Sequence, residues 1–219
     1  MAAPFGVLFD MDGVLVDSYA AHFESWRRLG AEVGFEMSES QFVASFGRTS
    51  REAIAEFWPH LATTPERIAA LDGRKEELFR EILAADFPAM DGARELIDAL
   101  HAAGFALALG SSGPPANVAL VMEKLGRQAK FAAVVTGMDV TRGKPDPQVF
   151  LLAAERIAVA PPRCLVIEDA AAGVAAAKAA GMKCLGLATL GRDPAVLARA
   201  DRVVASLRDV SVNDVRRLL

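Results

Sequence analysis

The sequence has few cysteines, and it lacks both a long basic run and a long apolar run. Its only cysteines, Cys164 and Cys184, lie at the starts of predicted strands, so we expect buried thiols rather than a disulfide. No apolar stretch reaches the roughly 18–20 residues that cross a bilayer. The N-terminal residues also lack the basic region of a signal peptide. These absences favour a cytoplasmic protein with no membrane partner.

Charge and size exclude further classes of function. The net charge is −4, with 24 basic and 28 acidic residues, which weighs against nucleic-acid binding. With 219 residues and 53% hydrophobic content, the chain can form a core domain and a smaller lobe. We favour a monomer that acts on a small molecule.

Two patterns divide the chain. Residues 1–17 contain one strand and residues 89–219 alternate strands with helices, whereas residues 18–88 contain only helix patterns. The alternation predicts an α/β fold, with a Rossmann-like parallel-sheet core of residues 1–17 and 89–219 and an inserted all-α domain of residues 18–88. The predicted strands are 5–9, 105–109, 131–136, 164–167 and 183–187. The predicted helices are 92–103, 116–126, 146–158 and 170–180 in the core, and a first helix from 17 or 18, then 38–46, 50–57 and 65–84, in the insert.

The first strand runs directly into two carboxylates, Asp10 and Asp12, followed by Gly13. If the strand continued, the i, i+2 spacing would place both acids on one face, and Gly13 would allow a sharp turn. Acids at the end of a buried strand are costly to desolvate unless a cation or a proton compensates them. This segment therefore predicts a nucleophile, an acid–base partner and a metal site together.

Other strands are also followed by polar groups. In a parallel sheet these ends share one edge, which is where open α/β sheets bind ligands. Taken singly, each residue is more often a turn, a helix cap or a surface charge, but together they match what a divalent cation and a phosphate require. The groups after the later strands are Ser111 with Ser112, Lys144, and Glu168 with Asp169.

These four segments resemble the four motifs of the haloacid dehalogenase-like (HAD) superfamily. The resemblance implies that Asp10 forms a phosphoaspartate and that Asp12 is the general acid and base. It also implies that Ser111, Ser112 and Lys144 hold the phosphoryl group. The Mg²⁺ ligands implied by the same resemblance are Asp10, Asp12 through its carbonyl, Glu168 and Asp169.

The insert resembles the helical cap of the branch that contains β-phosphoglucomutase and phosphoglycolate phosphatase. By that resemblance His22 and Arg51 bind substrate, although His22 also fits a packing position and Arg51 a solvated one. The mutase has a lysine where this chain has Phe46, which weakens a second phosphate site in the cap unless Arg48 or Arg51 compensates.

We therefore predict a Mg²⁺-dependent phosphatase that acts on a small phosphorylated metabolite, and the resemblance favours a sugar phosphate as the substrate. The alternative within the family is a β-phosphoglucomutase. A HAD-like binding or regulatory module is a third interpretation. The intact set of acids argues against that module, because an inactive relative is expected to lose Asp10 or Asp12.

Overall fold

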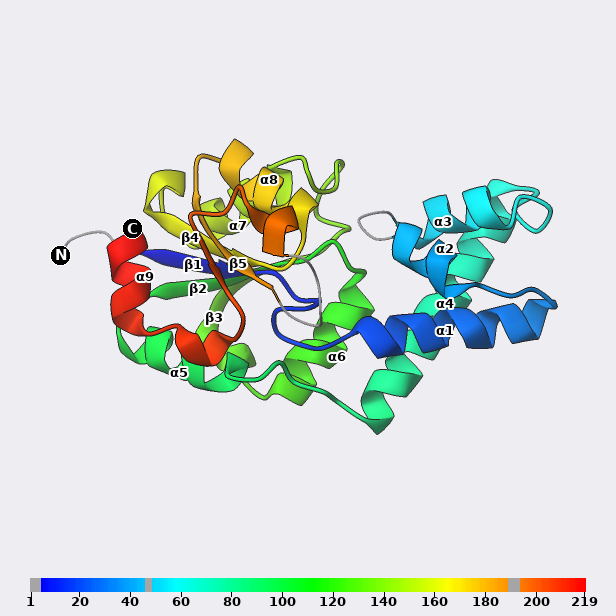
Figure 1. Ribbon diagram of the computed structural model, residues 1–219, viewed down its shortest axis with the longest axis horizontal. Coiled ribbons are helices and arrows are strands. Elements are labelled where there is room, and N and C mark those ends of the chain that lie inside the picture. The colour runs from blue at the N-terminus through cyan, green and yellow to red at the C-terminus, as the bar shows by residue number, and fades with distance from the viewer. Residues whose placement is uncertain (1–4, 46–48, 189–193) are drawn as a thin grey trace. The chain divides into compact units, whose positions relative to one another are not determined.

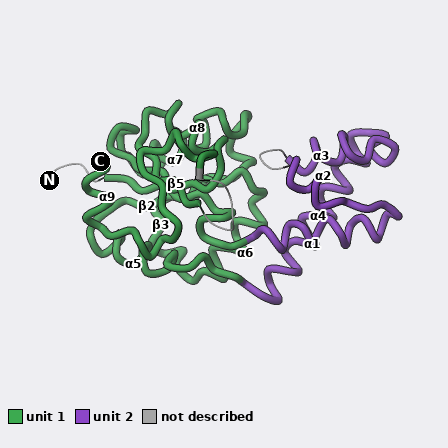
Figure 2. The backbone as a smooth tube through the Cα atoms, in the orientation of Figure 1, with its two compact units in different colours: residues 1–17, 88–219 green, residues 18–87 purple. Residues whose placement is uncertain are grey.

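The computed structural model describes residues 5–45, 49–188 and 194–219. The chain forms two compact units, one of residues 1–17 and 88–219 and the other of residues 18–87 (Figure 2). The second unit ends one residue earlier than the predicted insert. The first unit is therefore built from two separate segments of the chain, and the second unit is one continuous segment inserted between them.

The first unit contains a parallel sheet with the order β3-β2-β1-β4-β5-β6 (Figure 1). The first strand of the chain is therefore central, and β2 and β4 are its neighbours. This architecture confirms the predicted α/β fold. In the described part of the chain the strands are β1 (Gly6–Phe9), β2 (Ala106–Gly110), β3 (Phe131–Val135), β4 (Cys164–Glu168), β5 (Lys183–Leu187) and β6 (Arg202–Val204).

Helices cover both faces of the sheet, α7 and α8 on one and α5 and α6 on the other (Figure 1). All four residues of β1 are buried, as an uninterrupted apolar strand between two helical layers should be. The core helices are α5 (Ala93–Ala102), α6 (Pro115–Leu125), α7 (Gln148–Arg156), α8 (Ala171–Ala179) and α9 (Val212–Leu218). The short 3₁₀ segments are η1 (Gln128–Lys130), η2 (Pro161–Arg163), η3 (Pro194–Leu197) and η4 (Leu207–Asp209).

Three details of the core differ from the prediction. Strand β6 and helix α9 were not predicted, and α7 begins at Gln148 with Pro147, not Asp146, at its N-cap position. The Asp146 carboxylate still accepts a hydrogen bond from the Gln148 amide at 3.0 Å. It therefore pairs with an amide of the first turn of α7, although Asp146 lies one residue before the N-cap position.

The two cysteines are free and buried, as predicted. Burial raises the pKa of the Cys164 thiol to about 11 and that of the Cys184 thiol to about 12. Both residues therefore act as small apolar side chains of the core.

The second unit is helical, with α1 (Tyr19–Val33), α2 (Glu39–Ala44), α3 (Ser50–Phe57) and α4 (Pro65–Ala85). Helix α2 is shorter than the predicted helix 38–46. An aromatic cluster forms the core of this unit, in which Trp26 and Trp58 meet edge to face with ring centroids 5.5 Å apart. Among the described residues, no helix combines the length and the apolar character needed to span a membrane.

Candidate active site

The site begins where β1 ends. Strand β1 stops at Phe9, so Asp10 and Asp12 lie in the following turn rather than on the strand itself. The Asp10 amide still donates to the Ile167 carbonyl at 3.0 Å, which ties this turn to β4. The Asp10 side chain is buried and that of Asp12 is half-buried. The turn and its hydrogen bond to β4 therefore position the two acids. The alternation of side chains along a strand does not, because β1 has already ended at Phe9.

A buried lysine joins two of the predicted acids. The Lys144 ammonium lies 2.5 Å from Asp10 Oδ1 and 2.7 Å from Glu168 Oε1. It also sits 4.7 Å from the centroid of the Phe150 ring, which belongs to α7. Lys144 is 134 positions from Asp10 in the chain, so this contact is created entirely by the order of the strands.

Three carboxylates gather at this point. Oxygen atoms of Asp10, Glu168 and Asp169 all lie within 4.8 Å of one another, and all three residues are buried. The second oxygen of Glu168 accepts a hydrogen bond from the Ala170 amide at 2.8 Å. Lys144 contacts two of these acids, Asp10 and Glu168, so acidic groups outnumber the ammonium group described in this cluster. Hard oxygen ligands and this excess charge fit a divalent cation such as Mg²⁺.

Burial and the charges of the site also shift the pKa values of Asp10 and Lys144. Burial raises the pKa of Asp10 well above its usual range, Lys144 opposes that rise, and the charges of Glu168, Asp169 and Asp12 reinforce it. Burial disfavours the charged form of Lys144, but Asp10 and Glu168 outweigh this and raise the pKa of the ammonium. Lys144 therefore stays charged, and the neighbouring carboxylates repel the negative charge of Asp10. A bound cation would reduce this repulsion.

Two glycines make room for the acids. A Cβ on Gly13, where φ is +74°, would lie 2.0 Å from Asp169 Oδ2. A Cβ on Gly173 in α8 would lie 1.6 Å from Glu168 Oε1. Neither carboxylate could keep its place if these positions carried a side chain, so the two glycines shape the carboxylate cluster directly.

Gly173→Ala should therefore destabilise the protein by about 1–3 kcal/mol, because the new methyl group overlaps the buried Glu168 carboxylate. The matched control is Gly73→Ala in α4, where nothing lies within 4 Å of the added Cβ. That variant should gain up to about 1 kcal/mol from helix propensity. Urea unfolding of both variants measures the difference. Equal stability changes in the two would show that Gly173 does not shape the site.

The predicted phosphate-binding serines follow β2. Ser111 is buried, and its hydroxyl accepts a hydrogen bond from the Gly113 amide at 3.0 Å. The Ser111 amide donates a hydrogen bond to the carbonyl oxygen of Val135 in β3 at 3.0 Å. Ser112, in contrast to the buried Ser111, is exposed. Since β2 pairs directly with β1, Ser111 stands at the same sheet edge as Asp10.

His22 and Arg51 belong to the helical unit. The His22 ring stacks on Phe79 with centroids 4.0 Å apart, and its Nδ1 lies 2.8 Å from the Lys75 ammonium. The His22 ring therefore occupies a packing position and also has a polar partner, and its role in substrate binding stays a prediction. Arg51 is exposed and pairs with Asp72 at 2.8 Å. Phe46 and Arg48 lie outside the described residues.

Sequence reasoning missed Lys75. This lysine is only 2% exposed, although it lies in a charged run of α4 that resembles an ordinary solvated helix face. The helical spacing did contain a signal, because Lys75 falls in line with the apolar positions Leu71, Leu78 and Phe79, all of which are buried.

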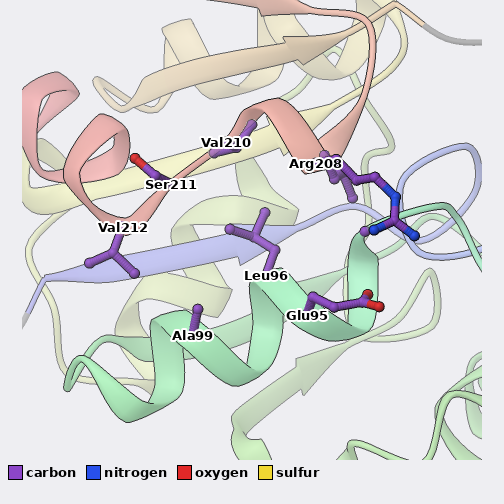
Figure 3. Close-up of a pocket in the computed structure, with 9 residues that line it drawn as sticks. Glu95, Leu96, Ala99, Arg208, Val210, Ser211 and Val212 are labelled. Carbon is purple, nitrogen blue, oxygen red and sulfur yellow. The ribbon is translucent and has the colours of Figure 1, made fainter.

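A shallow depression of about 350 Å³ lies elsewhere on the first unit, between α5, η4 and the start of α9 (Figure 3). Glu95 and Arg208 are its charged residues, and none of the residues predicted to act on phosphate lines it. The depression therefore has no part in the chemistry of the carboxylate cluster. Its apolar lining includes Leu96, Ala99, Val210 and Val212.

Comparison with known proteins agrees with this geometry. The family described as haloacid dehalogenase-like hydrolase matches residues 6–181. The chain is 35% identical over 211 residues to validoxylamine A 7'-phosphate phosphatase of Streptomyces hygroscopicus subsp. limoneus, covering 93% of this chain and 94% of that protein. It is 33% identical over 184 residues to a phosphorylated carbohydrates phosphatase of Thermotoga maritima, covering 81% and 82%. Its fold is similar to that of β-phosphoglucomutase from Clostridium difficile, with a TM-score of 0.87, 24% identity and coverage of 98% and 96%.

Proposed function

Because the chain belongs to the haloacid dehalogenase-like hydrolases, we propose that it is a Mg²⁺-dependent phosphatase of small phosphorylated sugar-like metabolites. The observation that carries the proposal is the buried group of Asp10, Glu168 and Asp169 with the Lys144 ammonium 2.5 Å from Asp10. Few other arrangements give a nucleophilic carboxylate, a fixed cation and a set of hard ligands at one strand end.

In the proposed mechanism an Asp10 oxygen attacks phosphorus, and the bond from phosphorus to the ester oxygen breaks as the new bond forms. Asp12 donates its proton to the departing oxygen, so the alcohol leaves neutral. Asp12 then takes a proton from water, and the water oxygen attacks phosphorus as the bond from phosphorus to the Asp10 oxygen breaks. Inorganic phosphate leaves, and the Asp10 carboxylate and the Asp12 proton are restored.

The other residues hold the phosphoryl group. Lys144 already lies beside Asp10 and supplies positive charge next to the nucleophile. The Ser111 hydroxyl stands at the neighbouring strand end and is placed to bond a phosphoryl oxygen. Asp10, Glu168, Asp169 and the Asp12 carbonyl would hold Mg²⁺, which when bound neutralises the negative charge that otherwise repels a phosphate dianion.

The substrate class follows from the relatives. By their names, the two phosphatases act on validoxylamine A 7'-phosphate and on phosphorylated carbohydrates, and the chain covers most of their length. We propose that the helical unit is a cap that selects such a substrate through His22 and Arg51. Both residues lie in that unit, and the Arg51 side chain is exposed.

The charges of the helical unit favour hydrolysis over transfer to a second hydroxyl. A mutase must bind a second phosphate, which requires a cation whose charge is still available. Arg51 is paired with Asp72 at 2.8 Å, and Lys75 is paired with Glu76 at 2.9 Å. Each of these cations therefore already has a carboxylate partner, which weakens the case for a second phosphate site.

Incubation with β-glucose 1-phosphate and a trace of the bisphosphate should release free phosphate with little glucose 6-phosphate, because water accepts the phosphoryl group when no second phosphate is held. Both products are followed in the same reaction. Faster formation of glucose 6-phosphate would identify a mutase. A protein that turns over neither this ester nor a generic aryl phosphate would instead fit a binding module. Phe46→Lys, which adds the cation found in the mutase, should shift the ratio towards transfer.

A further inference from the structure

The loop between β3 and α7 carries Lys144, and most of this loop is exposed. Residues 138, 139 and 141–143 are all exposed, and the Met138 side chain is 77% exposed. Apolar packing therefore does not fix the course of most of the loop. Its shape depends instead on polar contacts with α7, the helix that begins at Gln148.

Gln148 holds the end of the loop that lies next to Lys144. Its Oε1 accepts hydrogen bonds from the Thr141 amide at 2.9 Å, the Thr141 hydroxyl at 3.2 Å and the Arg142 amide at 3.1 Å. Backbone amides donate and cannot accept, so the oxygen of the Gln148 side chain, and not its nitrogen, must face the loop. Three donors from two consecutive residues therefore attach this end of the loop to the first residue of α7.

A second residue of α7 holds the start of the loop. Arg156 donates to the Val134 carbonyl and to Asp139 Oδ1, each at 2.6 Å. The other carboxylate oxygen of Asp139 accepts from the amide and the hydroxyl of Thr136, each at 2.8 Å. None of these bonds involves Gln148, so they should persist when Gln148 is replaced. The effect of such a replacement should then be confined to the end of the loop that carries the lysine.

Helix α7 also contacts the Lys144 ammonium itself. The ring of Phe150, which is fully buried, has its centroid 4.7 Å from the ammonium, and the ammonium in turn contacts Asp10 and Glu168. A lysine on a loosely held loop has more conformations to lose when its ammonium is placed between two carboxylates. Attachment of the loop to α7 lowers this cost, because it fixes the backbone from which the side chain extends.

We infer that Gln148 is a positioning residue, which holds the loop against α7 so that the Lys144 ammonium stays beside Asp10. Loss of the Gln148 acceptor should slow phosphoryl transfer, because the charge of Lys144 acts on the phosphoryl group only from a fixed position. This effect on catalysis rests on the proposed function. The attachment of the loop and the placement of the ammonium are properties of the protein without substrate, and they are tested separately.

The test compares two replacements of Gln148 in the full-length protein. In Gln148→Met the side chain keeps its length but loses its acceptor. In Gln148→Glu a carboxylate oxygen accepts the same three hydrogen bonds, and a negative charge in the first turn of a helix is favourable. The two variants therefore separate the loss of the acceptor from the replacement of the residue as such.

The first readout is a nitrogen–proton correlation spectrum of the lysine ammonium groups without substrate, in which Lys144→Met identifies the Lys144 signal by its loss. We expect this signal in the wild type and in Gln148→Glu, and we expect it broadened or lost in Gln148→Met. An unchanged signal in Gln148→Met would overturn the inference. Amide hydrogen exchange of Thr141 and Arg142 tests the wild type alone. Exchange of both amides as fast as in an unfolded chain would overturn the inference even if Gln148→Met failed to fold.

The second readout is the rate with para-nitrophenyl phosphate and saturating Mg²⁺. The kcat/KM of Gln148→Met should fall roughly tenfold, because a small displacement of a charged group away from the reacting atoms is enough for such a loss. That of Gln148→Glu should stay close to the wild-type value. A wild-type rate in Gln148→Met, or equal losses in both variants, would contradict the positioning role. Absence of phosphate release by the wild type would instead contradict the proposed function and leave the results of the spectrum and of the exchange intact.

Discussion

Replacement of Asp10 by asparagine should reduce phosphate release at least about a thousandfold, equivalent to roughly 4 kcal/mol in the activation barrier. The amide has nearly the shape of the carboxylate but is a poor nucleophile, so the covalent step is lost. Glu168 still pairs with Lys144 at 2.7 Å, and the fold should therefore remain. Initial rates with saturating Mg²⁺ measure the effect.

Asp17→Asn is the matched control, because Asp17 is half-buried near the same turn but is outside the carboxylate group. Its rate should stay close to that of the wild type, and circular dichroism should show both variants folded. An Asp10→Asn rate within about tenfold of the wild type would remove Asp10 as the nucleophile.

Removal of metal should have an effect of similar size. A chelator is expected to abolish turnover and added Mg²⁺ to restore it, because three buried carboxylates lie within 4.8 Å of one another and Lys144 contacts only two of them. Asp169→Ala should raise the Mg²⁺ concentration that gives half the maximal rate. Full activity in excess chelator would contradict a metal-dependent mechanism.

The same charges predict how stability depends on pH without metal. The folded-state pKa of Asp10 is raised by burial, so the protonated acid favours the folded state at low pH. The metal-free protein should therefore lose stability as pH rises through that raised pKa. Mg²⁺ should remove this loss, since it binds the ionised carboxylates and stabilises the folded state. Melting temperatures at several pH values, with chelator and with Mg²⁺, compare the two conditions.

The sequence predicted the sheet well because its first five strands are short apolar runs between turn signals. Strand β6 was missed because it has only three residues, one of them Arg202, and so lacks such a run. The strand ends predicted which residues converge, and the structure brings together Asp10, Lys144, Glu168 and Asp169. Their catalytic roles remain predictions.

The contacts within the helical unit could not be predicted in the same way. The bond between Lys75 and His22 joins α4 to α1, and the residues are 53 positions apart. It depends on how the two helices pack. The spacing of Lys75 with the apolar positions of α4 indicates that this lysine is buried, but it does not identify the partner in α1. The partner of Arg51, Asp72, is likewise set by the packing of α3 against α4.

The aromatic cluster of the helical unit has a consequence for spectroscopy. Both tryptophans, Trp26 and Trp58, and the single tyrosine, Tyr19, lie within residues 18–87. Ultraviolet absorption near 280 nm and intrinsic fluorescence therefore come from this unit, while the unit that contains the carboxylates is almost silent. An unfolding curve followed by fluorescence describes the helical unit alone, and only a comparison with circular dichroism shows whether the parallel sheet unfolds with it.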